Sequence, residues 1–167
     1  KILKKRLKKI KIYPDFKKID KKLKVKADYT MSAISGIEGL RPTIGIIKKS
    51  KRIAIANKES LICGWGLIQK ELKKHKTEFI PVDSEHFSIW KSLKYNVPTD
   101  IKEIILTASG GPFLNTPLEK MYKIKVTDAL KHPNWSMGKK ISIDSSTMMN
   151  KVFEIIEARN IFFYFLI

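Results

Sequence analysis

The stretch KRIAIANKESLICGWGLIQKELKKHKTEFIPV, residues 51–82, sets the expected fold of this chain. An apolar run at 51–57 is followed by a longer segment, 59–76, with Leu and Ile at helical spacing, and then by a second apolar run at 77–82. This pattern predicts two parallel strands joined by a crossover helix. Ligands of such sheets bind at the carboxyl ends of the strands, so the residues just after each strand are the first candidates for function.

The residues before this stretch continue the same alternation. Residues 27–35 are typical of a buried strand, and residues 38–49 of the helix that leads to the strand at 51–57. Thirteen basic residues occur among the first 26, interspersed with Ile, Leu and Tyr, which favours a basic helix or helix–loop segment. A parallel α/β sheet is therefore expected up to residue 82.

The pattern changes after Val82, where we expect a boundary between a domain at 1–82 and a second domain at 83–167. The elements expected in the second domain are helices over 84–93, 118–124 and 127–132, strands over 101–109 and 141–144, and a final helix from Ser145.

Composition limits the classes of function. A net charge of +18 would suggest nucleic acid, but only four of the 34 basic residues are Arg, the residue preferred for bidentate phosphate and base contacts. A lysine-rich solvated surface is the favoured interpretation. The alternative, a basic nucleic-acid-binding module, would be supported by steeply salt-dependent binding to duplex DNA.

Other classes are also limited. No apolar run reaches the roughly 18 residues of a membrane span, and no signal peptide is visible. Cys63 is the single cysteine, which excludes a disulfide within the chain and indicates a reducing compartment; its apolar helical surroundings predict a core residue.

The final helix carries four polar residues close together. Asn150, Lys151, Glu154 and Glu157 fall on one narrow arc, with apolar residues around the rest of the circumference, so we expect a polar arc on an otherwise buried helix. An ordinary amphipathic helix with a Lys–Glu pair is the simpler interpretation. Ser145 and Ser146 at the expected helix start favour an anion there, which makes a phosphate site with Asn150 and Lys151 the alternative.

Three carboxylates form the second candidate site. Asp83 and Glu85 directly follow the strand at 77–82, where Asp83 alone would be read as a helix cap. Together with Glu154 they make a hard-oxygen ligand set of the kind that Mg²⁺ or Mn²⁺ accepts.

Two further loops follow strands. TASGGPF (107–113) has a Gly-Gly turn that can bring backbone N–H groups to an anion, with the Ser109 hydroxyl beside it; an ordinary tight turn is the alternative. ANKES (56–60) sets Lys58 at a strand end before a helix, where a helix cap with a solvated lysine is the simpler interpretation.

These motifs together, and above all HPNWSMGKKISIDSSTMMNK (132–151), resemble the 1-deoxy-D-xylulose 5-phosphate reductoisomerase family. The resemblance extends from about residue 27 to 162. It implies the C-terminal part of a Rossmann-like parallel-sheet nucleotide domain, followed by the first part of an α+β catalytic domain. It also implies the conversion of 1-deoxy-D-xylulose 5-phosphate to 2-C-methyl-D-erythritol 4-phosphate in non-mevalonate isoprenoid biosynthesis, with NADPH and a divalent cation (Mg²⁺, Mn²⁺ or Co²⁺).

The resemblance assigns roles residue by residue. It implies metal ligation by Asp83, Glu85 and Glu154, and catalytic roles for these three residues and Lys58. The implied phosphate-binding residues are Ser109, Ser145, Asn150 and Lys151, with His132 lining the same site. Substrate contacts fall on Lys58, Ser84, Glu85 and Glu154, NADPH contacts on Asn57, Glu59 and Gly138, and a closing loop on Trp135 and Met137.

The chain also departs from the family pattern. The Gly-rich nucleotide fingerprint is not found, and the FYFLI end (163–167) differs from the family's continuation. We therefore expect a central piece of the enzyme that is inactive alone; a non-catalytic remnant is the alternative. The family implies a sugar-phosphate substrate, a homodimer, no nucleic-acid or membrane partner, and the bacterial cytoplasm, or the plastid in a eukaryote.

Overall fold

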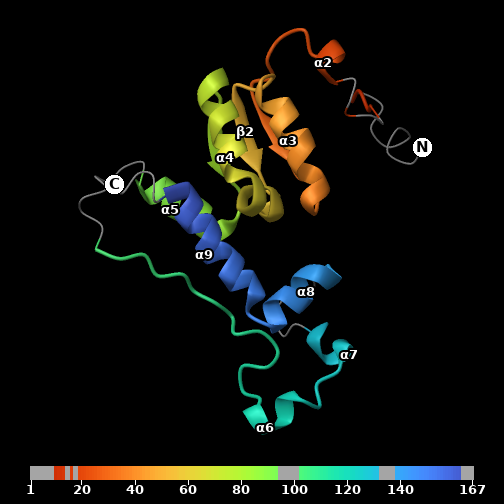
Figure 1. Cartoon of the computed structure of the whole chain (residues 1–167), viewed down its shortest axis with the longest axis vertical. Helices are drawn as coiled ribbons and strands as arrows, with labels where there is room; N and C mark the ends of the chain where they lie inside the picture. The colour runs from red at the N-terminus through yellow and green to blue at the C-terminus, as the bar shows by residue number, and fades with distance from the viewer. Residues whose placement is uncertain (1–9, 14–15, 17–18, 94–101, 132–137, 163–167) are drawn as a thin grey trace. The chain divides into compact units, whose positions relative to one another are not determined.

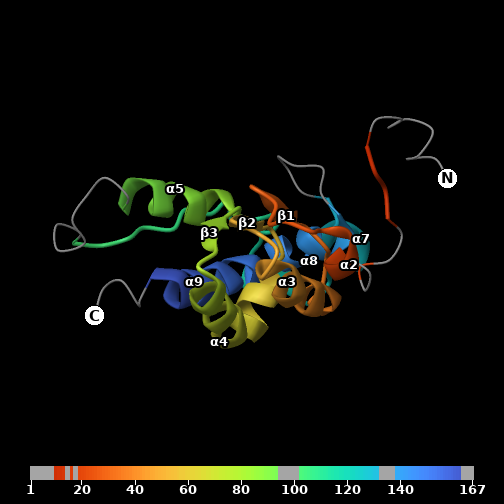
Figure 2. The same cartoon turned by 90° about the horizontal axis from the view of Figure 1, so that it is seen from above.

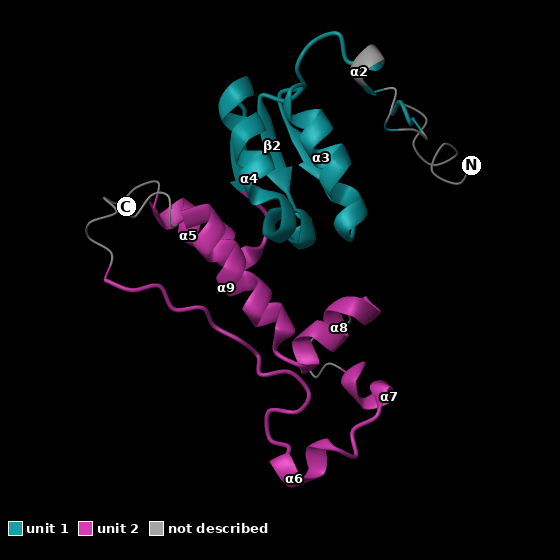
Figure 3. Cartoon of the chain, viewed as in Figure 1, with its two compact units in different colours: residues 1–80 teal, residues 81–167 magenta. Residues whose placement is uncertain are grey.

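The computed structural model describes residues 10–13, 16, 19–93, 102–131 and 138–162. The chain divides into two compact units, residues 1–80 and 81–167 (Figure 3). Each unit is described by itself below. None of the helices in the described ranges is long and apolar enough to cross a membrane.

The first unit is built on a three-stranded sheet in the order β1-β2-β3. The strands are β1 (Thr30–Ser32), β2 (Arg52–Ile55) and β3 (Glu78–Pro81), and β1 pairs in parallel with β2 from Thr30↔Ile53 to Ser32↔Ile55. The parallel α/β arrangement predicted from the alternating pattern is confirmed. The strands are shorter than predicted, since only their central residues have paired neighbours.

Two helices cover the same side of this sheet and pack against each other (Figure 2). They are α3 (Leu40–Ile47), preceded by the 3₁₀ turn η2 (Ile37–Gly39), and α4 (Lys58–His75); the short α2 (Ile19–Lys22) comes earlier in the chain. At their crossing, a Cβ on Gly64 would lie 2.3 Å from the Leu40 side chain, so a larger residue would force that side chain to move. The buried core contains Ile47, Ile53, Leu61 and Ile68.

The second unit is mainly helical (Figure 1). Its helices are α5 (Ser84–Leu93), α6 (Leu118–Met121), α7 (Val126–Ala129), α8 (Lys139–Ser146) and α9 (Met149–Phe162). Contacts join α7 to α8, α8 to α9, and α5 to α9. Most of its fully buried large side chains are polar, which is unusual for a structural core and typical of a site.

Both strands predicted for this unit are wrong. Residues 102–110 form neither helix nor strand, and residues 141–144 belong to helix α8. A strand needs a neighbour for its backbone groups, and the described residues from 82 onward contain no strand. A four-residue apolar–polar alternation such as ISID is too short to distinguish the two-residue period of a strand from the 3.6-residue period of a helix.

The prediction for Cys63 is also wrong, because this residue is exposed on α4. The buried face of α4 contains Ser60, Leu61, Gly64, Ile68 and Leu72.

Candidate metal and phosphate site

Three carboxylates converge where α5 meets α9. Asp83 immediately precedes α5, Glu85 lies in its first turn, and Glu154 lies in the middle of α9. One carboxylate oxygen from each lies within 4.8 Å of the others. Glu154 is only 2% exposed, and Asp83 and Glu85 are half-buried. A negative charge this deeply buried has to be compensated by donors or cations.

Polar neighbours on α9 and α5 supply that compensation. The Asn150 side chain donates to Glu154 Oε1 at 2.6 Å, and the Lys151 ammonium contacts Glu154 Oε2. The same ammonium lies 3.5 Å from Glu85 Oε1. The Ser84 hydroxyl donates to Glu85 Oε2 at 2.6 Å. The structure therefore brings together six of the residues predicted for the site, from both of its helices.

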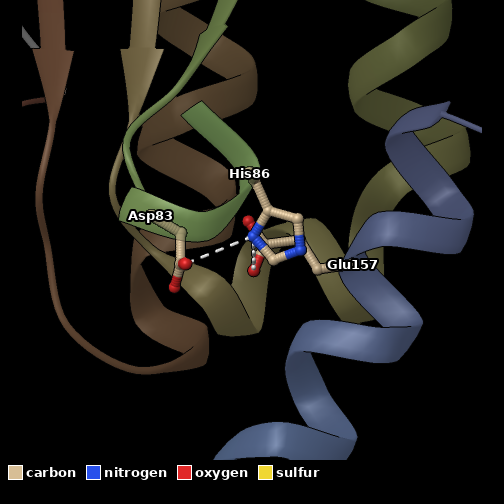
Figure 4. Close-up of side chains that lie close together, drawn as sticks. All are labelled: Asp83, His86 and Glu157. Carbon is tan, nitrogen blue, oxygen red and sulfur yellow. Dashed lines mark ion pairs between the residues drawn. The ribbon is translucent and has the colours of Figure 1, made fainter. Parts of the chain in front are cut away.

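A second buried cluster shares Asp83 with the first (Figure 4). The His86 ring is fully buried, with Nδ1 3.3 Å from Asp83 Oδ1 and 3.6 Å from Glu157 Oε2. Its Nε2 lies 2.9 Å from the Glu154 carbonyl oxygen. Because a carbonyl only accepts hydrogen bonds, Nε2 carries a proton, and Nδ1 is the atom turned toward the two carboxylates.

The pKa of His86 is shifted by these neighbours. Burial lowers the pKa of the imidazole, but the hydrogen bond with Asp83 and the charge of Glu157 outweigh burial and raise the pKa above its usual value. A protonated ring donates from both nitrogens, and it links the metal-ligand candidates Asp83 and Glu154 through one rigid group.

The orientation of α9 is opposite to the prediction. Glu154 and Glu157 are buried, whereas Val152, Ile155 and Ile156 are 42%, 57% and 37% exposed. The polar arc faces α5 because His86 and Lys151 satisfy its carboxylates there. An apolar pattern alone cannot reveal a buried polar face whose partners come from a distant segment.

The predicted helix N-terminus at Ser145 is wrong as well. Ser145 and Ser146 end α8, and the Ser146 and Thr147 hydroxyls donate back to the Ile143 carbonyl at 2.8 and 3.0 Å. Met148 then takes a left-handed conformation (φ 59°), and α9 starts at Met149. The anion-favouring N-terminus therefore belongs to α9, with Asn150 and Lys151 in its first turn.

The Gly-Gly loop lies against the end of α8. A Cβ on Gly111 (φ 69°) would lie 2.7 Å from the Ser145 carbonyl oxygen. The Gly111 N–H donates to the Ser109 hydroxyl at 3.3 Å, and the Lys151 ammonium donates to the Thr107 carbonyl. These contacts connect the loop with both Ser145 and Lys151.

The remaining predicted residues are placed as follows. Asn57 caps α4 by accepting from Ser60 N at 2.5 Å, and its side-chain amide donates to the Ile34 and Gly36 carbonyls, so it already has a structural role. Lys58 and Glu59 start α4, and Gly138 immediately precedes α8. Residues 132, 135 and 137 lie outside the described residues.

Sequence reasoning missed His86 and Glu157. His86 directly follows Glu85 and stands three residues after Asp83, and Glu157 stands three residues after Glu154. Helical spacing placed Glu157 on the polar arc, but only the packing of α5 on α9 brings it to His86.

Comparison with known proteins identifies the family. The profile of the 1-deoxy-D-xylulose 5-phosphate reductoisomerase C-terminal domain matches residues 79–162, and that of 1-deoxy-D-xylulose 5-phosphate reductoisomerase matches residues 1–65. The reductoisomerase of Pelagibacter ubique is 62% identical over 156 residues, 92% of this chain and 40% of that protein. The reductoisomerase of Geotalea uraniireducens is 53% identical over 136 residues, 81% of this chain and 35% of that protein.

Solved structures agree. A DOX-P reductoisomerase in complex with NADPH, fosmidomycin and magnesium superposes with a TM-score of 0.77 at 38% identity, covering 96% of this chain and 43% of that one. The Zymomonas mobilis reductoisomerase in complex with NADPH gives 0.76 at 42% identity, covering 88% and 38%. This chain thus spans less than half the length of its relatives. By its sequence profiles it belongs to the 1-deoxy-D-xylulose 5-phosphate reductoisomerase family.

Proposed function

We propose that this chain carries the metal- and phosphate-binding part of an enzyme that converts 1-deoxy-D-xylulose 5-phosphate to 2-C-methyl-D-erythritol 4-phosphate. The convergence of Asp83, Glu85 and Glu154 within 4.8 Å, in a chain of this family, is the observation that carries the proposal. Relatives of known structure contain magnesium and NADPH, which makes both the expected cofactors here.

The donor set fits a hard divalent cation. Three carboxylate oxygens are what Mg²⁺ and Mn²⁺ take from a protein, and they leave positions for water and substrate oxygens. When bound, the cation supplies Lewis acidity toward the substrate's oxygens. The contribution of the chain is to hold the ligands in place, which Asn150 does for Glu154 and Ser84 does for Glu85.

The chain itself is proposed to bind the phosphate group of the substrate. Lys151 and Asn150, in the first turn of α9, and the loop with Ser109 would bind this non-reacting group and so position the reacting end. NADPH supplies the hydride when bound. Residues 57, 59 and 138 are proposed to contact NADPH, on the basis of the family resemblance alone. On the same basis, residues 135 and 137 are proposed to close over the substrate.

The isolated 167-residue chain is proposed to be inactive, since it spans 40% of the Pelagibacter ubique enzyme. The chain alone would then bind the metal without catalysing the reaction.

A Mn²⁺ titration followed by electron paramagnetic resonance tests the metal site. Glu154→Gln should weaken Mn²⁺ binding by about tenfold or more, because it removes one charged ligand from a site with three. Glu119→Gln, on the exposed face of α6 in the same unit, is the matched control and should leave the affinity unchanged. Equal affinities in Glu154→Gln and the parent chain would remove Glu154 from the site.

A further inference from the structure

The ammonium group of Lys151 lies among the carboxylates of the candidate metal site. Its Nζ contacts Glu154 Oε2, lies 3.5 Å from Glu85 Oε1 and donates to the Thr107 carbonyl. The side chain is 16% exposed, so most of this arrangement is shielded from water. One lysine is thus paired with two of the three carboxylates proposed to hold a metal.

A divalent cation would be held by the same carboxylates, Glu85 and Glu154, together with Asp83. The ammonium already contacts one oxygen of Glu154 and lies close to one oxygen of Glu85. Two cations held between the same carboxylates in a shielded site repel each other strongly. The cation and the ammonium therefore cannot both occupy this position.

We infer that Lys151 is an exchangeable counter-ion: a divalent cation displaces its ammonium from Glu85 and Glu154, and the released ammonium becomes the phosphate-binding group. This inference rests on the proposed function, because it needs both the metal site and the phosphate site. Lys151 would thus have two roles, but not at the same time, because an ammonium paired with carboxylates is not available to bind a phosphate.

The surroundings of Lys151 allow a short movement. Its backbone is fixed in the first turn of α9, and its side chain already reaches the Thr107 carbonyl, two residues before Ser109. Gly111, two residues further, lies against Ser145. A rotation of the flexible lysine stem, with no shift of the helix, would bring the ammonium from the carboxylates toward Ser109, further along the same loop.

The exchange makes the two ligands cooperative. Metal binding frees Lys151 for phosphate, and phosphate binding draws Lys151 away from the carboxylates. By linkage, each ligand raises the affinity for the other by the same factor. The sugar phosphate would then bind best to a chain that already holds its metal.

Mn²⁺ alone is the probe, titrated into the full 167-residue chain. Lys151→Met removes the competing charge but keeps most of the length of the side chain, and it should tighten Mn²⁺ binding by about tenfold. Lys151→Arg keeps the charge and should bind Mn²⁺ as the parent does. Lys140→Met is the matched control, because Lys140 pairs with Asp144 at 2.6 Å, outside the carboxylate site, and should leave the affinity unchanged.

The outcomes separate this inference from the proposed function. If Glu154→Gln weakens Mn²⁺ binding but Lys151→Met does not tighten it, the metal site stands and the exchange is wrong. If Mn²⁺ binds neither the parent nor Lys151→Met, the metal site fails, and the exchange fails with it.

The exchange can also be tested by chemical modification of the unmutated chain, which does not depend on whether a variant folds. The rate at which an acylating reagent modifies Lys151, followed by mass spectrometry, should rise toward that of the exposed Lys140 when Mn²⁺ is added. An Mn²⁺-independent rate at Lys151 would overturn the exchange.

Discussion

The His86 Nε2 atom, in α5, lies 2.9 Å from the backbone carbonyl oxygen of Glu154, in α9, across 68 residues of sequence. The other ring nitrogen faces Asp83 at 3.3 Å and Glu157 at 3.6 Å. The ring also stacks on Phe162, with centroids 6.1 Å apart. One buried imidazole thus fixes the backbone of one proposed metal ligand and the side chain of another.

Replacing His86 should destabilise the second unit. His86→Asn should lower the free energy of unfolding by about 3 kcal/mol, because it removes the imidazole that faces the buried Glu157 carboxylate. Urea denaturation measures this change. His75→Asn is the control: His75 pairs with Glu71 at 3.2 Å but is more exposed, so a loss within about 0.5 kcal/mol is expected. Equal losses in the two variants would contradict a special role for His86.

The stability should also depend on pH through the same residue. The pKa of His86 is raised in the folded chain, where Asp83, Glu157 and the Glu154 carbonyl face the ring. A raised pKa gives stabilisation that is fully present below the unfolded value of 6.5 and is lost as the pH rises through the folded pKa. Unfolding free energies measured from about pH 6 upward should therefore fall in the parent chain, and His86→Asn should flatten that part of the profile. A parent profile without this fall would argue against an imidazolium.

The first unit could be predicted because its signals are local. Strands and helices between residues 27 and 82 follow from runs of apolar residues and from caps such as Asn57, and each run lies next to its sheet partner in the α/β order. The three carboxylates were found for a similar reason: Asp83 and Glu85 mark the end of β3, and Glu154 stands on a polar arc.

The second unit was harder because its packing depends on distant partners. The polar face of α9 turns inward since His86, 68 residues earlier, satisfies it, and no periodicity within α9 carries that information. The break between α8 and α9 depends on the left-handed Met148 and on hydroxyls that bond backward to Ile143. The sequence DSSTMMN is equally compatible with a helix that starts at its serines.

The contact between the Gly-Gly loop and α8 gives a further prediction. Gly111→Ala should destabilise the chain by about 1–3 kcal/mol, because φ is 69° and the new Cβ would clash with the Ser145 carbonyl. Gly138→Ala, with φ −60° and no atom within 4 Å of the new Cβ, should cost less, about 0.5 kcal/mol, since alanine is only a poorer N-cap than glycine. Thermal unfolding of both variants decides whether the loop is fixed by this contact.

Lys151 should matter for the sugar phosphate in an active enzyme. In a chain extended to the length of its relatives, Lys151→Ala should raise the Michaelis constant about tenfold and leave the turnover number less affected, since it deletes a charge-assisted contact to a non-reacting group. Steady-state kinetics with 1-deoxy-D-xylulose 5-phosphate measures the split. Unaltered kinetics would instead indicate that Lys151 serves only as the partner of Glu154.

The 167-residue chain alone should not catalyse the reaction. It spans 40% of the Pelagibacter ubique enzyme, and Asn57, one of its proposed NADPH contacts, is already engaged in capping α4. Several large apolar residues of α9 are exposed, so the helix that carries Glu154 and Lys151 lacks packing on that face within the described residues. A site displaced by about 1 Å can lose on the order of a hundredfold in rate. NADPH oxidation with 1-deoxy-D-xylulose 5-phosphate and Mn²⁺, measured beside a full-length relative, should stay at background. Turnover within about tenfold of the relative's rate, a barrier difference of only about 1.4 kcal/mol, would mean that these 167 residues contain everything the chemistry needs.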